Sequence, residues 1–152
     1  MAAFKGVNKT KADSPSGANI VDPGVLGGNV KVMVDNYVAV GTEVAGDTIA
    51  MGKALPKGAR ILEIILHTAA SGTGVTLDVG DAESHARYLS IIDCSSAAIA
   101  RLEAAELAGR HYEVDMTTAS TPDNQILITV HAATTVLTAA AEIKLTIFYT
   151  HE

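Results

Sequence analysis

Cysteine and aromatic residues are scarce in this chain. One cysteine, Cys94, occurs among 152 residues, so no disulfide can form within the chain and a disulfide-stapled extracellular fold is excluded. Aromatic residues make up 4% of the chain, and tryptophan is absent. The core must therefore be built from valine, isoleucine, leucine and alanine, and any binding surface lacks the large aromatic anchors common at strong contact sites.

Long apolar runs and excess positive charge are also missing. No run approaches the roughly 18 apolar residues of a membrane span, and residues 1–11 hold no apolar core of a secretory signal. We therefore expect synthesis and folding in a cytoplasm, with no membrane partner. The formal net charge is -6; residues 1–28 contribute +1, which leaves -7 for residues 29–152. An acidic body repels phosphate, so no nucleic-acid partner is predicted.

Acidic residues and histidines form no standard metal-binding motif. Asp78, Asp81 and Glu83 could offer oxygen ligands to calcium, but their spacing matches no standard loop, and a solvated acidic rim is the favoured interpretation. The other metal hypothesis combines two histidines with a glutamate on separate predicted strands, His85, His111 and Glu113. We predict neither a metal site nor a cofactor.

Nucleophilic catalysis also lacks a recognisable motif. Cys94 follows an apolar stretch and is predicted to be a small core residue, since no histidine stands near it in a known family pattern. No Ser-His-Asp order or pair of carboxylates stands out. We therefore predict that the protein is not an enzyme and name no catalytic residue.

Residues 1–28 differ in character from the rest of the chain. Ser14-Pro15-Ser16-Gly17, Asp22-Pro23-Gly24 and Gly27-Gly28 give this segment the turn chemistry of an extended strap. Its apolar residues are too few for a core but enough to anchor the segment on a neighbour. We predict an extended N-terminal arm over residues 1–28, whose binding residues are Phe4, Val7, Ile20, Val21, Val25 and Leu26.

Residues 29–152 show the period of two that is typical of strands. Strands are predicted at residues 30–35, 60–68, 75–79, 87–93, 111–116, 126–130 and 143–149, with weaker ones at 37–40 and 48–51. Turn signals such as residues 71–74 and 80–81 separate them. About eight strands predict an all-β fold, an antiparallel β-sandwich of jelly-roll type.

Three details of this prediction concern particular segments. In residues 30–35 the valines alternate with Lys31, Met33 and Asp35, which indicates a half-buried strand. In residues 60–68, Leu62, Ile64 and Leu66 are expected to share one apolar face, opposite a mixed face. Alanine-rich residues 95–108 favour a short helix that ends at Gly109. Outward apolar residues are candidate positions for an interface between copies of the chain: Ile61, Ile65 and Phe148.

Four segments together resemble small structural proteins of tailed bacteriophages, of the head-decoration or cement kind. They are the polar leader from Ser14 to Gly28, the strand at 30–35, residues 51–61, and residues 74–81. The resemblance implies a virion protein on the capsid surface that binds the major capsid protein and stabilises the expanded head. Because sandwiches can associate around a local threefold axis and three arms would multiply attachment, we also expect a homotrimer.

Two other functions remain open at this point. A phage neck, tail or fibre component would share this composition and differ only in its place in the particle. A small ligand- or carbohydrate-binding β-sandwich would need a concave site with polar groups and usually aromatic residues, and aromatic residues are scarce here.

Overall fold

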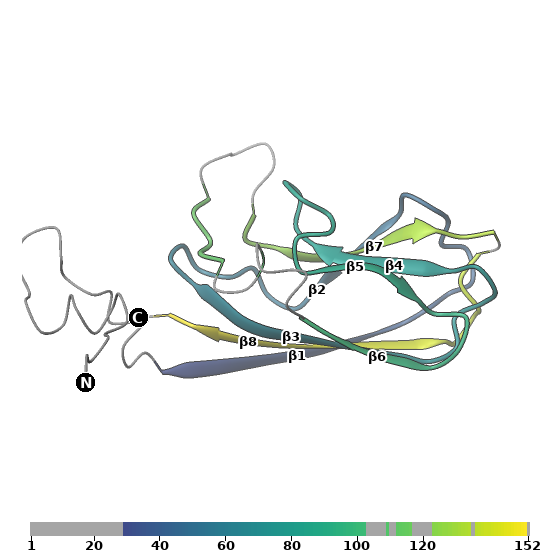
Figure 1. Ribbon diagram of the computed structural model, residues 1–152, viewed down its shortest axis with the longest axis horizontal. Helices are drawn as coiled ribbons and strands as arrows, with labels where there is room; N and C mark the ends of the chain where they lie inside the picture. The colour runs from purple at the N-terminus through teal and green to yellow at the C-terminus, as the bar shows by residue number, and fades with distance from the viewer. Residues whose placement is uncertain (1–28, 103–108, 110–111, 117–122, 135, 152) are drawn as a thin grey trace, which may run out of the picture.

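Two four-stranded antiparallel sheets stack face to face in the computed structural model of the chain (Figure 1). The structure describes residues 29–102, 109, 112–116, 123–134 and 136–151. The strands in chain order are β1 (Val30–Val38), β2 (Thr48–Met51), β3 (Arg60–Thr68), β4 (Thr76–Gly80), β5 (Leu89–Asp93), β6 (Ala98–Arg101), β7 (Ile126–Ala132) and β8 (Glu142–Thr150).

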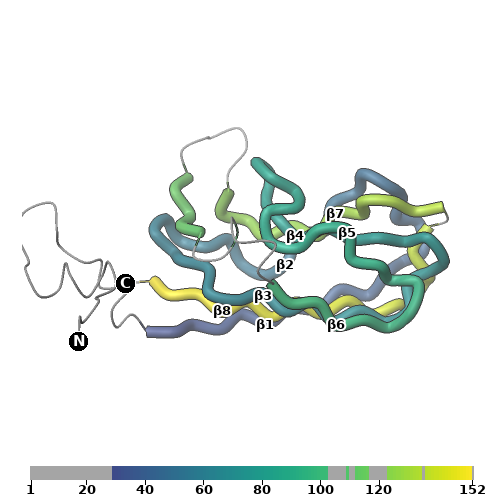
Figure 2. Tube along the Cα trace, in the orientation of Figure 1, coloured from purple at the N-terminus to yellow at the C-terminus, as the bar shows by residue number. Residues whose placement is uncertain are grey.

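The strand order identifies a jelly roll. One sheet has the order β1-β8-β3-β6 and the other β2-β7-β4-β5. The first strand thus pairs with the last, the second with the seventh, the third with the sixth and the fourth with the fifth, as in a long hairpin rolled around a barrel. The predicted antiparallel sandwich of jelly-roll type is confirmed. In Figure 2 the start of β1 lies beside the end of β8, consistent with the pairing of Val30 with Thr150.

The core lies between the sheets and is almost wholly aliphatic. Its fully buried members from the strands include Ile64, Leu66, Leu77, Val79, Ile126, Ile128, Val130 and Ile143. Tyr88 is the one large aromatic side chain among the fully buried residues of the described chain. This composition confirms the expectation of a core built mainly from valine, isoleucine, leucine and alanine. Alternation along each strand places every second side chain in this layer.

Strand β1 is longer than predicted: it runs on to Val38 and includes the first two residues of the segment expected as a separate strand at 37–40. Its burial alternates, and the valine side is the exposed one. Met33 and Tyr37, on the opposite side, pack against the core. Both sides of this strand are partly apolar, so alternation alone did not decide which one faces inward.

The predicted helix at residues 95–108 is wrong where the structure describes it. Residues 98–101 form strand β6, which pairs with β3 from Ile65 to Thr68. Helix propensities differ by less than about 1 kcal/mol per residue, and pairing with an existing sheet edge outweighs that preference. Residues 103–108 lie outside the described residues. The predicted strand at 111–116 is also wrong over 112–116, where the backbone makes one isolated bridge, from Glu113 to Arg60.

A β-bulge in β3 changes the predicted faces of that strand. Ile61 pairs with Tyr149 and Glu63 pairs with the adjacent Phe148, so Leu62 is an extra residue without a partner of its own on β8. The bulge turns Ile61 to the same side as Ile64, and both are completely buried. Ile61 is therefore a core residue, and its prediction as an interface position is corrected.

The aliphatic core gives a direct stability prediction. Leu77 is completely buried on β4, so Leu77→Ala removes apolar contacts and leaves a cavity. We expect the free energy of unfolding to fall by about 2–5 kcal/mol, measured by urea denaturation. Val44→Ala, at a residue that is 50% exposed, is the control and should change it by less than about 0.5 kcal/mol. Equal losses in the two variants would contradict the assigned core.

Candidate functional site

Several exposed apolar side chains of the described chain lie together on the outer side of β1. Val30, Val32, Val34 and Val38 point away from the core and are 58%, 55%, 59% and 51% exposed, respectively. The register with β8 places Val32 beside Phe148 and Val34 beside Thr146. We call these four valines the valine face. Apolar groups that gather on one strand in this way are typical of contact surfaces.

Contacts with the loop after β2 fix the orientation of β1. The backbone N–H of Gly52 donates to Asp35 Oδ2 at 2.6 Å, and the N–H of Lys53 lies 3.2 Å from Met33 Sδ. Gly52 has a φ of +64°, and a Cβ there would lie 2.6 Å from Met33 Sδ. Only glycine fits this close approach without displacing Met33. With Met33 and Asp35 held against this loop, the valines must face outward.

The edge of β1 beyond the valine face is free in the described part of the chain. β1 stands at the end of its sheet and pairs only with β8. Ala39 donates its N–H to Ala141 O at 2.9 Å. The backbone N–H and C=O groups of odd-numbered residues therefore point toward β8, and those of even-numbered residues point toward the free edge. The N–H of Asn36 there donates to Asp35 Oδ1 at 2.9 Å. An unpaired, apolar edge can receive another polypeptide.

Of the predicted interface residues, two lie next to the valine face. Phe148 is half-buried on β8 between β1 and β3, and Ile65 is 8% exposed on β3, opposite Thr146. Sequence reasoning missed the valines themselves. The larger apolar residues Met33 and Tyr37, four positions apart on the other side of β1, were the signal that could have identified the inward face. The predicted arm residues all precede residue 29 and lie outside the described residues.

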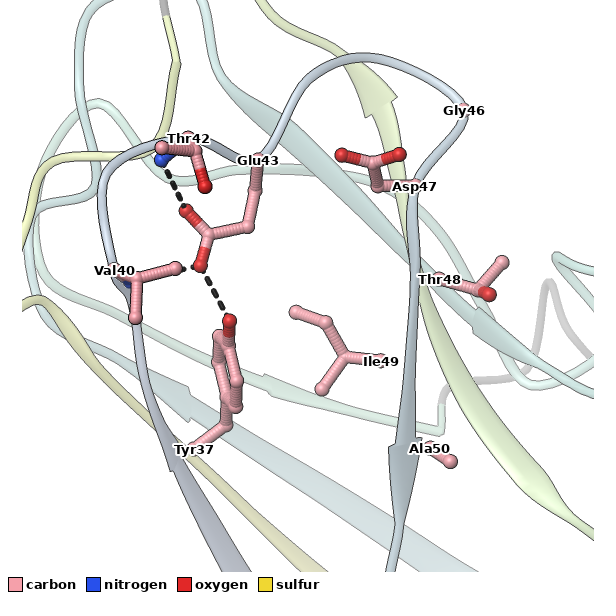
Figure 3. Close-up of a pocket in the computed structure, with 9 residues that line it drawn as sticks. All are labelled: Tyr37, Val40, Thr42, Glu43, Gly46, Asp47, Thr48, Ile49 and Ala50. Atoms are coloured by element: carbon pink, nitrogen blue, oxygen red, sulfur yellow. Dashed lines mark hydrogen bonds between the residues drawn. The ribbon is translucent and has the colours of Figure 1, made fainter.

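An open pocket of about 630 Å³ lies where β1 ends and β2 begins (Figure 3). Tyr37, Glu43 and Ile49 contribute to its lining. Tyr37 is its one aromatic residue, and the Tyr37 hydroxyl donates to Glu43 Oε1. This hydroxyl is thus committed within the protein, and the pocket holds a single aromatic ring, whereas carbohydrate sites usually offer several.

Glu43 organises the loop around this pocket. Its carboxylate accepts the N–H groups of Val40 at 2.8 Å, Gly41 at 2.9 Å and Thr42 at 3.0 Å, besides the Tyr37 hydroxyl. Burial opposes ionisation, but the hydrogen bonds from Tyr37 and the backbone outweigh it and lower the pKa of Glu43 from 4.5 to about 2. Glu43 is therefore a structural carboxylate with its acceptor sites filled.

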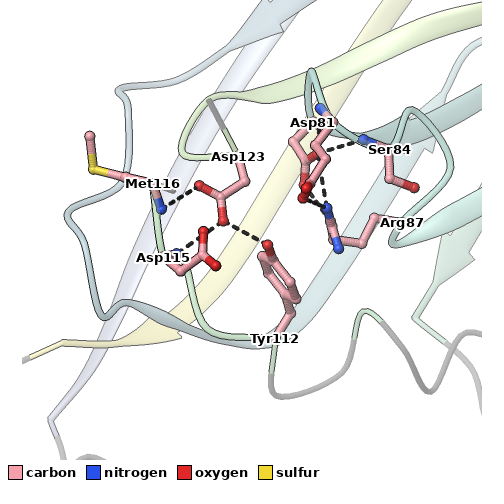
Figure 4. A network of polar contacts seen from close by, with 8 residues as sticks. Asp81, Ser84, Arg87, Tyr112, Asp115, Met116 and Asp123 are labelled. Atoms are coloured by element: carbon pink, nitrogen blue, oxygen red, sulfur yellow. Dashed lines mark hydrogen bonds and ion pairs between the residues drawn. The ribbon is translucent and has the colours of Figure 1, made fainter. Parts of the chain in front are cut away.

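A second polar network joins the loop after β4 to the segments before β7 (Figure 4). Asp81 is completely buried and accepts the N–H groups of Glu83 at 3.0 Å and Ser84 at 2.8 Å. Arg87 Nε lies 2.5 Å from Asp81 Oδ2, and Arg87 Nη2 lies 2.5 Å from Glu83 Oε2. Burial opposes the charge on Arg87, but the bond to Asp81 outweighs it and raises the pKa of Arg87.

The Arg87 guanidinium also stacks on an aromatic ring and so extends the network. It lies 3.9 Å from the centre of the Tyr112 ring. Tyr112 in turn donates its hydroxyl to Asp123 Oδ2 at 2.6 Å, and Asp123 also accepts the N–H groups of Asp115 at 3.0 Å and Met116 at 2.9 Å. Burial opposes the charge on Asp123, but these hydrogen bonds outweigh it and lower the pKa of Asp123. The network holds the described loops in place.

Asp78 carries out a different structural task on the outer side of the second sheet. Asp78 Oδ2 lies 2.7 Å from His131 Nδ1, and Asp78 Oδ1 accepts the N–H of Ile91 at 2.6 Å. Ile91 has a φ of +53°, a strained value for a β-branched residue, and its side chain is 58% exposed. The carboxylate thus supplies a partner at an irregularity in the pairing of β4 with β5.

In the part of the chain that the structure describes, the considered metal ligands do not come together. Asp78 and Asp81 are buried and hydrogen-bonded, so the expected solvated acidic rim is wrong for these two residues. Glu113 pairs with Arg60 at 2.5 Å, His85 is exposed, and His111 lies outside the described residues. Within the described ranges no three His, Cys, Asp or Glu side chains are grouped so that they could hold an ion.

The remaining candidate, Cys94, is a core residue as predicted. It is completely buried, and this burial raises the pKa of its thiol. Its Sγ lies 3.3 Å from the carbonyl oxygen of Ile92, to which it donates.

Among the described residues no helix has the length and hydropathy that crossing a membrane requires.

Glu43 gives a prediction with a defined pH dependence. Glu43→Gln removes the charge that four donors share, and the free energy of unfolding should fall by roughly 1–3 kcal/mol at pH 7. Because the folded pKa of about 2 lies below 4.5, the stabilisation is complete above about pH 4.5 and is lost as pH falls towards 2. Denaturation at pH 7 and pH 3 should show a smaller difference between wild type and variant at pH 3. A larger difference at pH 3 would contradict this role.

Asp81 and Glu83 provide a matched pair of substitutions around Arg87. Asp81→Ala leaves a mostly buried guanidinium without its main partner and should cost about 3–5 kcal/mol of unfolding free energy. Glu83→Ala removes a carboxylate whose side chain is 47% exposed and should cost less than about 1 kcal/mol. Urea denaturation measures both. Similar costs would show that the buried bond does not dominate the network.

Comparison with known proteins finds likenesses among solved structures. No family model matches the sequence, and no curated protein matches it. A chain of the Cyanophage Pam1 capsid asymmetric unit is 25% identical, with a TM-score of 0.68 over 91% of this chain and 99% of that chain. A chain of the capsid of Ralstonia phage GP4 is 22% identical, with a TM-score of 0.63 over 82% of this chain and 86% of that chain. These likenesses support a phage structural protein.

Proposed function

We propose that this chain is a decoration, or cement, protein of a phage head. It is made in the host cytoplasm, binds the shell of major capsid protein on its outer surface and stabilises the expanded head. The observation that carries the proposal is the likeness to a chain of a phage capsid asymmetric unit, which extends over 91% of this chain and 99% of that one. A match over nearly the whole of both chains supports a similar role for the whole chain, beyond a shared domain.

The chemistry of the described residues is consistent with a purely structural role. Each buried carboxylate discussed above is occupied by backbone N–H groups, an arginine, a tyrosine or a histidine. Such carboxylates hold loops, and their oxygens are already engaged in hydrogen bonds within the protein instead of being free to accept a proton from a substrate. The exposed apolar groups instead gather on a sheet face, as expected of a protein that works through contacts with other proteins.

Attachment is proposed to combine the arm with association of copies. The arm, residues 1–28, lies across neighbouring capsid subunits and binds through its apolar residues, Phe4, Val7, Ile20, Val21, Val25 and Leu26. Three copies form a homotrimer with three arms. Once one arm is bound to the capsid, the other two are held near their own binding sites at a high effective concentration. This arrangement gives strong attachment without large aromatic anchors.

Binding to heads tests the proposal. Purified protein should co-sediment saturably with expanded heads that are built from the major capsid protein of the same phage and lack this chain, and should raise their melting temperature. A form without residues 1–28 should keep its circular dichroism and melting temperature but bind roughly 100-fold more weakly, because avidity from the arms is lost. Failure of the full chain to bind heads would refute the proposal. Unfolding of the shortened form would refute a separate arm.

The place of the protein in the particle separates this proposal from a neck, tail or fibre role. Immunogold labelling of intact virions should mark the whole head surface. Label confined to the neck, the tail or the fibres would replace the decoration role with a role in that part.

A further inference from the structure

We propose that the valine face is the contact between copies of this chain, and that its occupant is the β1 strand of a neighbouring copy. The inference deepens the proposed homotrimer and rests on that part of the proposed function, but it is independent of attachment to the capsid. The valine face and the free edge of β1 lie at the border of one sheet, where β1 is drawn in Figure 1. One contact between copies would cover both.

Exposed apolar groups are concentrated on strand β1. Four of the exposed large hydrophobic residues alternate along β1 at positions 30, 32, 34 and 38. The register places the half-buried Phe148 of β8 beside Val32, so the apolar surface extends from β1 to the neighbouring strand. Burying such a surface in a contact is favourable because it removes apolar groups from water.

The distribution of charge also favours a contact between copies. The acidic and basic groups on this side of the sheet cancel, because Glu63 pairs with Arg101 at 3.0 Å and Glu142 lies 3.9 Å from Lys144. The chain as a whole carries -6, so copies repel one another when they approach through an average part of the surface. A neutral side with charges of both signs at its border is complementary to itself. This property favours a second copy as the occupant.

The free edge of β1 is long and regular. Within the described residues β1 has nine residues, contains no proline and has no bulge against β8, although it carries the charged residues Lys31 and Asp35. A long edge without proline or a bulge keeps backbone groups available for pairing with another strand. Around a threefold axis the three β1 strands can converge, so the valines of each copy meet those of its neighbours at the axis, whereas pairing of two β1 edges alone would give a twofold dimer.

Single-cysteine labelling tests the proposal. The native Cys94 is completely buried, so a cysteine introduced on the surface is the reactive one. Val34→Cys reports on the valine face, and Ser90→Cys, at an exposed position of β5 in the other sheet, is the matched control. Maleimide reaction rates are measured on the full chain over a range of protein concentrations, and light scattering gives the mass at each concentration.

Coverage by a second copy follows mass action. The rate at Val34→Cys should fall roughly tenfold or more as the mass rises from monomer to oligomer, while the rate at Ser90→Cys stays constant. A constant, fast rate at Val34→Cys at all concentrations would refute the proposal. Protection that is already complete in a monomer would also refute it, because the occupant would then be part of the same chain.

A charge substitution provides an independent test. Combining Val32→Glu with Val34→Glu should give a folded monomer at concentrations where the wild type is oligomeric, whereas Thr48→Glu, at an exposed position of β2, should keep the wild-type mass. Circular dichroism checks the folding of each variant. An unchanged mass in the double variant would refute the proposal.

Head binding is scored separately from these results. A wild type that is oligomeric through β1 but does not bind heads would refute the decoration role alone. A monomeric wild type that binds heads would refute this inference and the proposed homotrimer, and would leave the decoration role in place.

Discussion

The orientation of strand β1 is the constraint on which the proposed contacts of this protein depend. Met33 and Tyr37 pack on the core, and Asp35 accepts the N–H of Gly52, so this side of the strand is held inward. Side chains alternate along a strand, and the valines must therefore face out. The same alternation leaves the backbone groups of the even-numbered residues at the free edge. Packing inside the sandwich thus determines the apolar surface outside it.

Buried carboxylates hold the described loops in place through hydrogen bonds to the backbone. Glu43, Asp81 and Asp123 each accept several backbone N–H groups, and Asp78 accepts one from the strained Ile91. Such bonds satisfy backbone donors where the chain leaves the sheets, which is where a jelly roll has its long connections. Carboxylates used in this way stabilise the fold, which is consistent with a structural protein of a phage particle that acts through its surface contacts.

The sequence predicted the fold class because the alternation in residues 75–79, 126–130 and 143–149 is regular. It failed where tertiary contacts outweigh local preference. The alanines of residues 98–101 favour a helix, yet they pair with β3, and the bulge at Leu62 turns Ile61 into the core. The valine face was missed because both sides of β1 are apolar enough to be buried. For the candidate sites, the core position of Cys94 was predicted correctly, whereas the binding role of the arm residues stays a prediction.

A cryo-EM reconstruction of the phage head that carries this chain would test the central claim most directly. The account predicts jelly rolls on the outer capsid surface, grouped around symmetry axes, with the β1 strands of neighbouring copies in contact. Jelly rolls that sit on the head with β1 facing solvent would contradict the role of the valine face. Density for the protein only in the neck or tail would contradict the decoration role itself.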